Sequence, residues 1–149
     1  MFDSVFTKED VTLVNIEHIP TDTAFLGELF CALGDSGVNV DMICRPTDYS
    51  CNSELSFTVD DADLIPTLSV VGGFSEKYKR LTCSFSAGNC KLSVKDSKMA
   101  DMHSICGLFF KALAKANIEI LLVTTDYDEI SVLLNCCDLR KAVYKISTL

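Results

Sequence analysis

The apolar positions of this chain change their period several times, and each change marks the border of an expected element. Residues 11–16 are β-branched and apolar, which predicts a strand. The apolar residues within 26–33 recur every three or four positions, which is the spacing of one face of a helix. Residues 38–43 and 55–59 predict two more strands, joined by a polar turn at 47–52.

A second helix is expected after the strand at 55–59. Asp60 and Asp61 stand where an N-cap and acidic first-turn residues are favourable. Pro66 then has to lie in the first turn or kink the helix. At the end of the first helix, Gly37 suits the left-handed conformation that helix C-termini often need. The positions of the second helix that are expected to pack are Leu64, Leu68 and Val71.

The same series of elements occurs twice. Four blocks of the first half align in order with four blocks of the second half, and four of the eight positions in the longest block are identical. An ordered series of matches indicates a repeat, so we interpret the chain as two copies of a module of about 60–70 residues. The aligned blocks are 26–33 with 106–113, 37–40 with 117–120, 54–57 with 129–132, and 63–64 with 138–139. The closing helix of the second copy is expected to pack through Leu139, Ala142, Val143 and Ile146.

Each copy has the order βαββα, and one further strand would complete the βαββαβ ferredoxin-like fold. The first copy can take that strand from residues 81–87, whereas the second copy has almost no chain left and can take it from 3–7. We therefore expect an α+β protein with two ferredoxin-like modules in tandem, each an antiparallel sheet with helices on one face. The expected domains are 11–88, and 89–149 completed by 3–7. Pairing with a second chain would cover exposed strand edges, so a homodimer is expected.

Composition narrows the range of partners. The chain has 149 residues, of which 48% are hydrophobic, and a formal net charge of −8. Binding to nucleic acid or to an anionic membrane surface requires clustered Lys and Arg, so neither is expected. No stretch approaches the ~18–20 apolar residues of a membrane span, and the first residues lack the basic and then apolar pattern of a signal peptide. We expect a cytoplasmic protein.

The sequence contains eight cysteines and two histidines but no recognisable catalytic or metal-binding spacing. Zinc sites favour ligand pairs two to four residues apart, and Cys136 and Cys137 are merely adjacent. A disulfide framework requires a secreted context. We therefore expect the cysteines to be buried or incidental free thiols, with metal or redox chemistry as the alternative. No cofactor, metal or catalytic residue is expected.

Several motifs resemble one family. Residues 37–43 (GVNVDMI) are similar to the GINVDMI signature of aspartokinase regulatory regions, and 54–59 resemble the strand beyond it. In the second copy, 90–94 with Met99, and 130–139, resemble the matching segments more loosely. The family is that of ACT domains, which are ferredoxin-like regulatory modules that bind amino acids. The resemblance covers residues 3–146.

This resemblance implies a tandem pair of modules that dimerises side by side, with an effector site for lysine or threonine at an ACT–ACT interface. The N-terminus of the first expected helix would bind the ligand carboxylate, Asp41 would accept from its ammonium, and Asn39 would orient either end. Phe25 and Leu26 are expected to contribute mainly packing. The implied ligand-binding residues are Ile19, Pro20, Thr21, Asp22, Ala24, Phe25, Leu26, Asn39, Val40, Asp41, Ser53 and Glu54.

The chain departs from the family pattern at the expected pocket. Thr23-Ala24 replaces a Pro-Gly pair, and Arg45 replaces a glutamine. In the second copy, Glu119 and Leu121 replace the Asn and acidic residues, so that copy is expected to have no ligand role and Leu121 is expected to pack.

Three functions follow from these observations. The first is an amino-acid-binding regulatory protein without kinase activity, either stand-alone or the regulatory subunit of a biosynthetic aspartokinase. The second is a structural dimerisation module with a decayed pocket. The third is a cysteine-based metal or thiol sensor.

Overall fold

The computed structural model describes residues 2–46, 53–99 and 104–149. The chain divides into two compact units. The first unit is Asp10–Ala87, and the second unit combines Met1–Glu9 with Gly88–Leu149. Two strands of 14 residues, β1 (Ser4–Glu17) and β4 (Thr82–Lys95), contribute residues to both units. The expected strands at 3–7 and 11–16 are therefore parts of one continuous strand.

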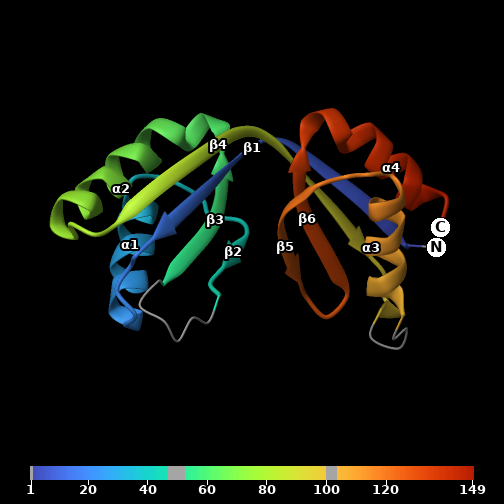
Figure 1. Ribbon diagram of the computed structural model, residues 1–149, viewed down its shortest axis with the longest axis horizontal. Coiled ribbons are helices and arrows are strands. Elements are labelled where there is room, and N and C mark those ends of the chain that lie inside the picture. The colour runs from blue at the N-terminus through green and yellow to red at the C-terminus, as the bar shows by residue number, and fades with distance from the viewer. Residues whose placement is uncertain (1, 47–52, 100–103) are drawn as a thin grey trace. The chain divides into compact units, whose positions relative to one another are not determined.

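The first unit has the order βαββαβ, and its strands lie in the sheet order β2-β3-β1-β4. Strand β3 is antiparallel to both β1 and β2, and its register with β1 runs from Val11↔Asp60 to Glu17↔Glu54. The two helices lie against one face of these strands (Figure 1). Between β1 and β4, the elements are α1 (Thr23–Asp35), β2 (Ile43–Cys44), β3 (Glu54–Asp60), a short 3₁₀ turn η1 (Asp61–Asp63) and α2 (Leu64–Lys77).

The second unit repeats this arrangement with the sheet order β1-β4-β6-β5. Strand β4 is antiparallel to β6 from Asn89↔Asn135 to Lys95↔Glu129, and β5 is antiparallel to β6. Its helices again lie on one face (Figure 1). The elements after β4 are α3 (Ile105–Lys115), β5 (Ile120–Thr125), β6 (Glu129–Asn135), a 3₁₀ turn η3 (Cys136–Asp138) and α4 (Leu139–Ser147). The α+β fold class with ferredoxin-like modules is confirmed.

Each unit has its own hydrophobic core, because apolar side chains alternate with polar ones along its strands and its helices each present one apolar face to the sheet. In the first unit, Val14 and Ile16 of β1 point inward two residues apart and meet Leu29 and Leu33 of α1. Phe57 of β3 is fully buried among them. In the second unit the closing helix packs as predicted, with Leu139, Ala142 and Ile146 buried and Val143 partly buried.

The N-terminal residues are bound to the second unit. Phe2 and Val5 pack against its core, and the Phe2 ring meets the Phe109 ring edge-on with 6.2 Å between centroids. The Asp3 carboxylate accepts hydrogen bonds from the backbone N–H and the hydroxyl of Ser97, both at 2.9 Å. These bonds lower the pKa of Asp3, so this contact weakens as the pH falls through that lowered pKa. Phe6 points away from the core and is 57% exposed.

Several details of the expected elements were wrong. Of the strand expected at 38–43, only Ile43 belongs to β2 (Ile43–Cys44), although the Asp41 N–H donates to the Thr58 carbonyl at 3.1 Å just before it. Asp60 is the N-cap of η1 and Asp61 is an acid in its first turn, as expected, but α2 itself follows Asp63, and the Asp61 carboxylate accepts from the Thr12 hydroxyl at 2.6 Å. The expected turn at 47–52 lies outside the described residues.

Helix α2 buries Val71 as expected and half-buries Leu64, but Leu68 does not pack. It begins at Leu64, which places Pro66 in the first turn, as one of the two predicted alternatives required. With this start, Thr67 and Val71 are buried, while Leu68 is 44% exposed. Thr67 tolerates burial because its hydroxyl donates to the Asp63 carbonyl at 2.7 Å.

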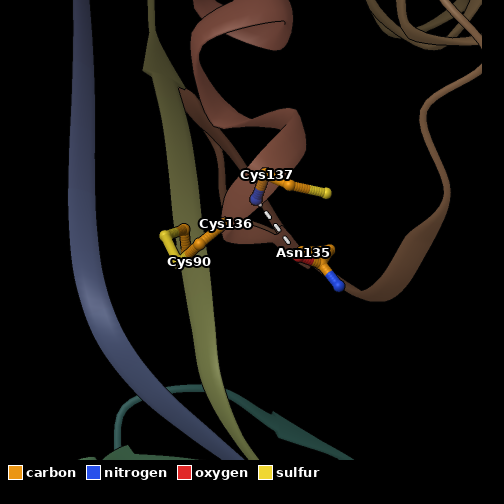
Figure 2. Close-up of a disulfide and its surroundings, with 4 residues drawn as sticks. All are labelled: Cys90, Asn135, Cys136 and Cys137. Atoms are coloured by element: carbon orange, nitrogen blue, oxygen red, sulfur yellow. Dashed lines mark hydrogen bonds between the residues drawn. A yellow bond between two sulfur atoms is a disulfide. The ribbon is translucent and has the colours of Figure 1, made fainter.

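The expectation that the cysteines are free thiols was wrong for two of those described. Cys90 and Cys136 form a disulfide across 46 residues of sequence, with Cα atoms 5.1 Å apart. Figure 2 shows that it links β4 to the turn before α4, while the Cys137 side chain points away. The sequence spacing could not reveal this pair, because β4 and the turn after β6 meet only through sheet pairing. The exposed free thiols among the described residues are Cys31, Cys83, Cys106 and Cys137.

Candidate functional site

The loop between β1 and α1 is fastened to two other segments of the first unit. The Ile19 N–H donates to the Ser53 carbonyl at 3.2 Å. The Arg45 Nη2 donates to the Thr21 carbonyl at 2.8 Å. Glu54 lies opposite Glu17, the residue before the loop, so all these groups lie at one end of the sheet. The loop is thereby held in one position relative to the ends of β2 and β3.

The same loop leads directly into the N-terminus of α1. Asp22 is the N-cap, and its Oδ1 accepts from the Phe25 N–H at 2.8 Å. Thr23 and Ala24 are exposed in the first turn, where N–H groups have no partner within the helix and carry a partial positive charge. Phe25 is only 1% exposed, and its ring meets those of Phe74 and Tyr78 edge-on. An anionic ligand here would therefore contact backbone atoms rather than the Phe25 side chain.

The Asp22 cap can be tested by itself. Replacement by Ala removes the bond to the Phe25 N–H and should lower the free energy of unfolding by about 1 kcal/mol. Asp35 is the matched control, because it is the last residue of α1 and an acid there opposes the helix dipole. Asp35→Ala should therefore be neutral or slightly stabilising. Urea unfolding of both variants checks this, and equal losses would contradict the capping role.

The structure separates the expected pocket into two groups. The loop group comprises nine of the expected residues and lies at the sheet end described above. The strand group comprises Asn39, Val40 and Asp41, and it precedes β2 where the Asp41 N–H donates to Thr58. Thr58 lies four residues along β3 from Glu54, or ~13 Å at ~3.3 Å per residue. The loop group is Ile19, Pro20, Thr21, Asp22, Ala24, Phe25, Leu26, Ser53 and Glu54.

Burial differs between the members of the two groups. Asn39 and Asp41 are exposed, and Val40 is partly buried against the core. In the loop group, Ile19 and Ser53 are buried at 4% and 6% exposure. Pro20 and Leu26 are half-buried, while Thr21, Asp22, Ala24 and Glu54 are exposed. A ligand at the loop group could therefore reach polar side chains and backbone groups together.

Arg45 was not among the expected ligand residues, although it belongs with the loop group. The sequence did indicate that this position is unusual, because Arg45 stands where the resembled family has a glutamine. Its contact with Thr21 became visible only in the fold. Among the described residues, no cluster of His, Cys, Asp and Glu could hold a metal ion. None of the helices described is long and apolar enough to span a bilayer.

Comparisons with known proteins agree on one kind of protein. No family model matches the chain. The aspartokinase of Helicobacter pylori is 27% identical over 136 residues, covering 91% of this chain and 32% of that protein. The chain thus spans about a third of the length of the curated relatives it matches. The ligand-free regulatory subunit of aspartate kinase from Thermus thermophilus has a TM-score of 0.90 at 19% identity, covering 99% of this chain and 97% of that one. This chain has the tandem ACT fold of aspartokinase regulatory regions.

A third comparison is with a whole aspartokinase solved with ligands. Aspartokinase III of E. coli, solved in complex with lysine and aspartate, has a TM-score of 0.75 at 18% identity. It covers 99% of this chain, and this chain covers 32% of it. The ACT fold therefore occurs both in whole aspartokinases and in separate regulatory subunits.

The second ACT unit has different residues at the positions equivalent to the strand group. Glu119 is exposed, and Leu121 lies at an irregularity of β5 between Ile120 and Leu122. Leu121 is 38% exposed, so the expectation that it packs was wrong; its neighbour Ile120 packs against the core, and side chains alternate along a strand. His103 lies outside the described residues.

Proposed function

We propose that this chain is a regulatory protein that binds a free amino acid through its first ACT unit. It would act as a stand-alone ACT protein or as the regulatory subunit of an aspartokinase in the cytoplasm, without kinase activity of its own. The relation to aspartokinases over only a third of their length supports this role. The observation that carries the binding site is the loop group, with the Arg45 guanidinium beside the N-terminus of α1.

The loop group has the chemistry that an amino-acid carboxylate requires. The first-turn N–H groups of α1 and the guanidinium of Arg45 both favour an anion. A guanidinium also pairs with a carboxylate through two parallel hydrogen bonds, which fixes the orientation of the ligand. The ammonium group of the ligand then needs an acceptor, and Asp41 of the same chain lies too far along the sheet.

A second copy of the chain would supply that acceptor. β2 is the outermost strand of the first unit, and Ile43 on it is 49% exposed. If two copies pair β2 antiparallel about a two-fold axis at Ile43, Asp41 of one copy lies opposite Arg45 of the other. Asp41, Ile43 and Arg45 share one face of the strand because side chains alternate. Each dimer would then hold two composite sites, each with an Arg45 from one copy and an Asp41 from the other.

Affinity measurements on single variants test this site. Calorimetry against the twenty amino acids should find a ligand, and lysine or threonine is the expected class. Arg45→Ala and Asp41→Asn should each weaken its binding by about ten- to over a hundredfold, because each removes a hydrogen bond to a charged group. Both side chains lie at the surface, so unfolding of the free protein should change by about 0.5 kcal/mol at most. Glu119→Gln in the second unit is the control and should leave the affinity unchanged.

Mixing the two variants tests the shared site. An equimolar mixture of Arg45→Ala and Asp41→Asn chains forms half mixed dimers, and each mixed dimer has one intact site. Calorimetry should then recover about a quarter of the wild-type sites at wild-type affinity. Recovery of none, with dimers present in sedimentation, would place the site within one chain and contradict the composite arrangement.

A second candidate function is a dimerisation module that binds no effector. This function is favoured by the hydrogen bond from Arg45 to the Thr21 carbonyl, because that bond holds the loop against the end of β2 without a ligand. Thr23 and Ala24 also lack the backbone freedom of the Pro-Gly pair that they replace. The absence of any thermal shift with all twenty amino acids, for a protein that sediments as a dimer, would support this function instead.

A further inference from the structure

A cleft on the first unit adjoins the loop group, with which it shares Ile19 and Pro20, and has a different character. It has a volume of about 730 Å³, which is within the usual range for small-molecule sites. The end of β1 and its loop form one wall, and the turn from α2 into β4 forms the other. Neither Arg45 nor Glu54 lines it. The lining residues are His18, Ile19, Pro20, Lys77, Tyr78, Lys79, Arg80 and Thr82.

The charges of this cleft are of one sign. Lys77, Lys79 and Arg80 lie within four consecutive positions, and no acidic residue is among those that line the cleft. Lys77 is paired with Glu28 at 3.2 Å, whereas both Lys79 and Arg80 are exposed. In a chain whose net charge is −8, such a concentration of cations attracts anions locally.

The neutral part of the cleft supplies hydrogen bonds and an apolar wall. The His18 ring nitrogen Nδ1 lies 3.5 Å from the Thr82 hydroxyl, so β1 and β4 each bring a polar group. Ile19, Pro20 and Tyr78 line the remainder. The Tyr78 ring is held by edge-on contact with Phe25 and stacking on Phe74, which makes this wall rigid.

The backbone of His18 is a second, independent indication. Its φ is 58°, in the left-handed region that a residue with a β-carbon seldom adopts. The next residue holds this conformation through the Ile19–Ser53 hydrogen bond. Strained backbone that the surrounding structure maintains is concentrated at binding sites, and here it turns His18 into the lining of the cleft.

We propose that this cleft binds a phosphate-bearing small molecule, with Lys79 and Arg80 contacting the phosphate and Ile19, Pro20 and Tyr78 contacting its apolar part. A guanidinium is well suited to phosphate oxygens because it can donate two parallel hydrogen bonds. His18 adds a polar ring nitrogen from the opposite wall, and Thr82 adds a hydroxyl from the wall of Lys79 and Arg80. The ligand is distinct from the proposed amino-acid effector, because neither Arg45 nor Asp41 is among the residues that line the cleft, although Ile19 and Pro20 belong to both sites.

Calorimetry with pyrophosphate and with AMP tests the proposal at low salt. Both should bind the full chain with one site per chain, and AMP should bind more tightly if the apolar wall takes part. Replacing Lys79 and Arg80 together by Glu should weaken binding by at least about tenfold. The control replaces Arg140 and Lys141 by Glu, since these exposed neighbours on α4 give the same change in net charge. The control should leave the affinity within about twofold.

Three results would overturn the proposal. They are no saturable binding of either probe, equal losses in both double variants, and tighter binding of an acidic peptide such as polyglutamate than of AMP. The last result would make the cleft a protein-docking surface. Titration with the amino-acid effector should be unaffected by the Lys79 and Arg80 changes, so failure of this proposal is distinguishable from failure of the proposed function. Circular dichroism melts confirm that the exposed variants fold.

Discussion

Removal of residues 1–9 should lower the free energy of unfolding by about 3–5 kcal/mol. These residues are remote in sequence from the rest of the second unit, yet Ser4–Glu9 is part of it and borders β4 in the sheet order. The truncation removes the packing of Phe2 and Val5 on the core and exposes an edge of β4. This loss of free energy does not include any contribution from the hydrogen bonds of the exposed Asp3 carboxylate to Ser97.

Hydrogen exchange measures where the loss occurs. Amides of β4 and β6 in the second unit should exchange much faster after truncation, while those of β3 should change less. Because the truncated chain could fail to fold, the double variant Phe2→Ala, Val5→Ala gives a milder test in the same direction. Phe6→Ala is the control, since Phe6 is 57% exposed, and it should change stability by about 0.5 kcal/mol at most. A truncated protein that melts like the full chain would show that the N-terminal residues contribute nothing to the fold.

Reduction of the Cys90–Cys136 disulfide should destabilise the oxidised protein by up to about 4 kcal/mol. The bond closes a loop across 46 residues. Closing a loop of that length lowers the conformational entropy of the unfolded chain and stabilises the folded protein by about this free energy. Cys136→Ser should reproduce the effect of reduction, because Cys136 is the half-buried partner and its hydroxyl can reach water. Cys137→Ser is a closely matched control, because Cys137 is exposed and its side chain points away from the disulfide (Figure 2).

Urea unfolding with and without reductant checks this prediction. Wild type and Cys137→Ser should lose stability on reduction, while Cys136→Ser should be insensitive to reductant. A thiol titration of the denatured protein should find two fewer free thiols before reduction than after. Equal thiol counts, with equal stability of all three proteins, would show that the pair remains as thiols. In a reducing compartment, the protein should have the lower free energy of unfolding, which is that of the reduced form.

Most of the fold was predictable because its signals are local. Helix α4 buries Leu139, Ala142 and Ile146, as their spacing indicated, since residues three and four apart share a helix face. Gly37 has a φ of 78°, the left-handed conformation expected after α1. The repeat then indicated two modules of the same kind, because equal patterns bury their apolar faces in equal ways.

The errors arose where contacts between elements decide which side chains are buried. In helix α2, Thr67 rather than Leu68 faces the core. The Asp61 carboxylate accepts from Thr12 of β1, a contact that the local rules for helix N-termini do not include. Leu121 is exposed while its neighbour Ile120 packs against the core, and the unbroken apolar run of β5 did not reveal which of the two faces inward.

The candidate sites depended still more on tertiary structure. The sequence alone determined the two βαββα patterns, the resemblance to ACT regions and the segments that could form a pocket. Only the fold decided that Arg45 meets Thr21, that Asp41 lies at the other end of β3, that Cys90 meets Cys136, and that His18 faces Lys79 and Arg80 across a cleft. The physical reason is that periodicity reports which face of an element is buried. Strand register and helix docking, which join residues tens of positions apart, determine which side chains meet.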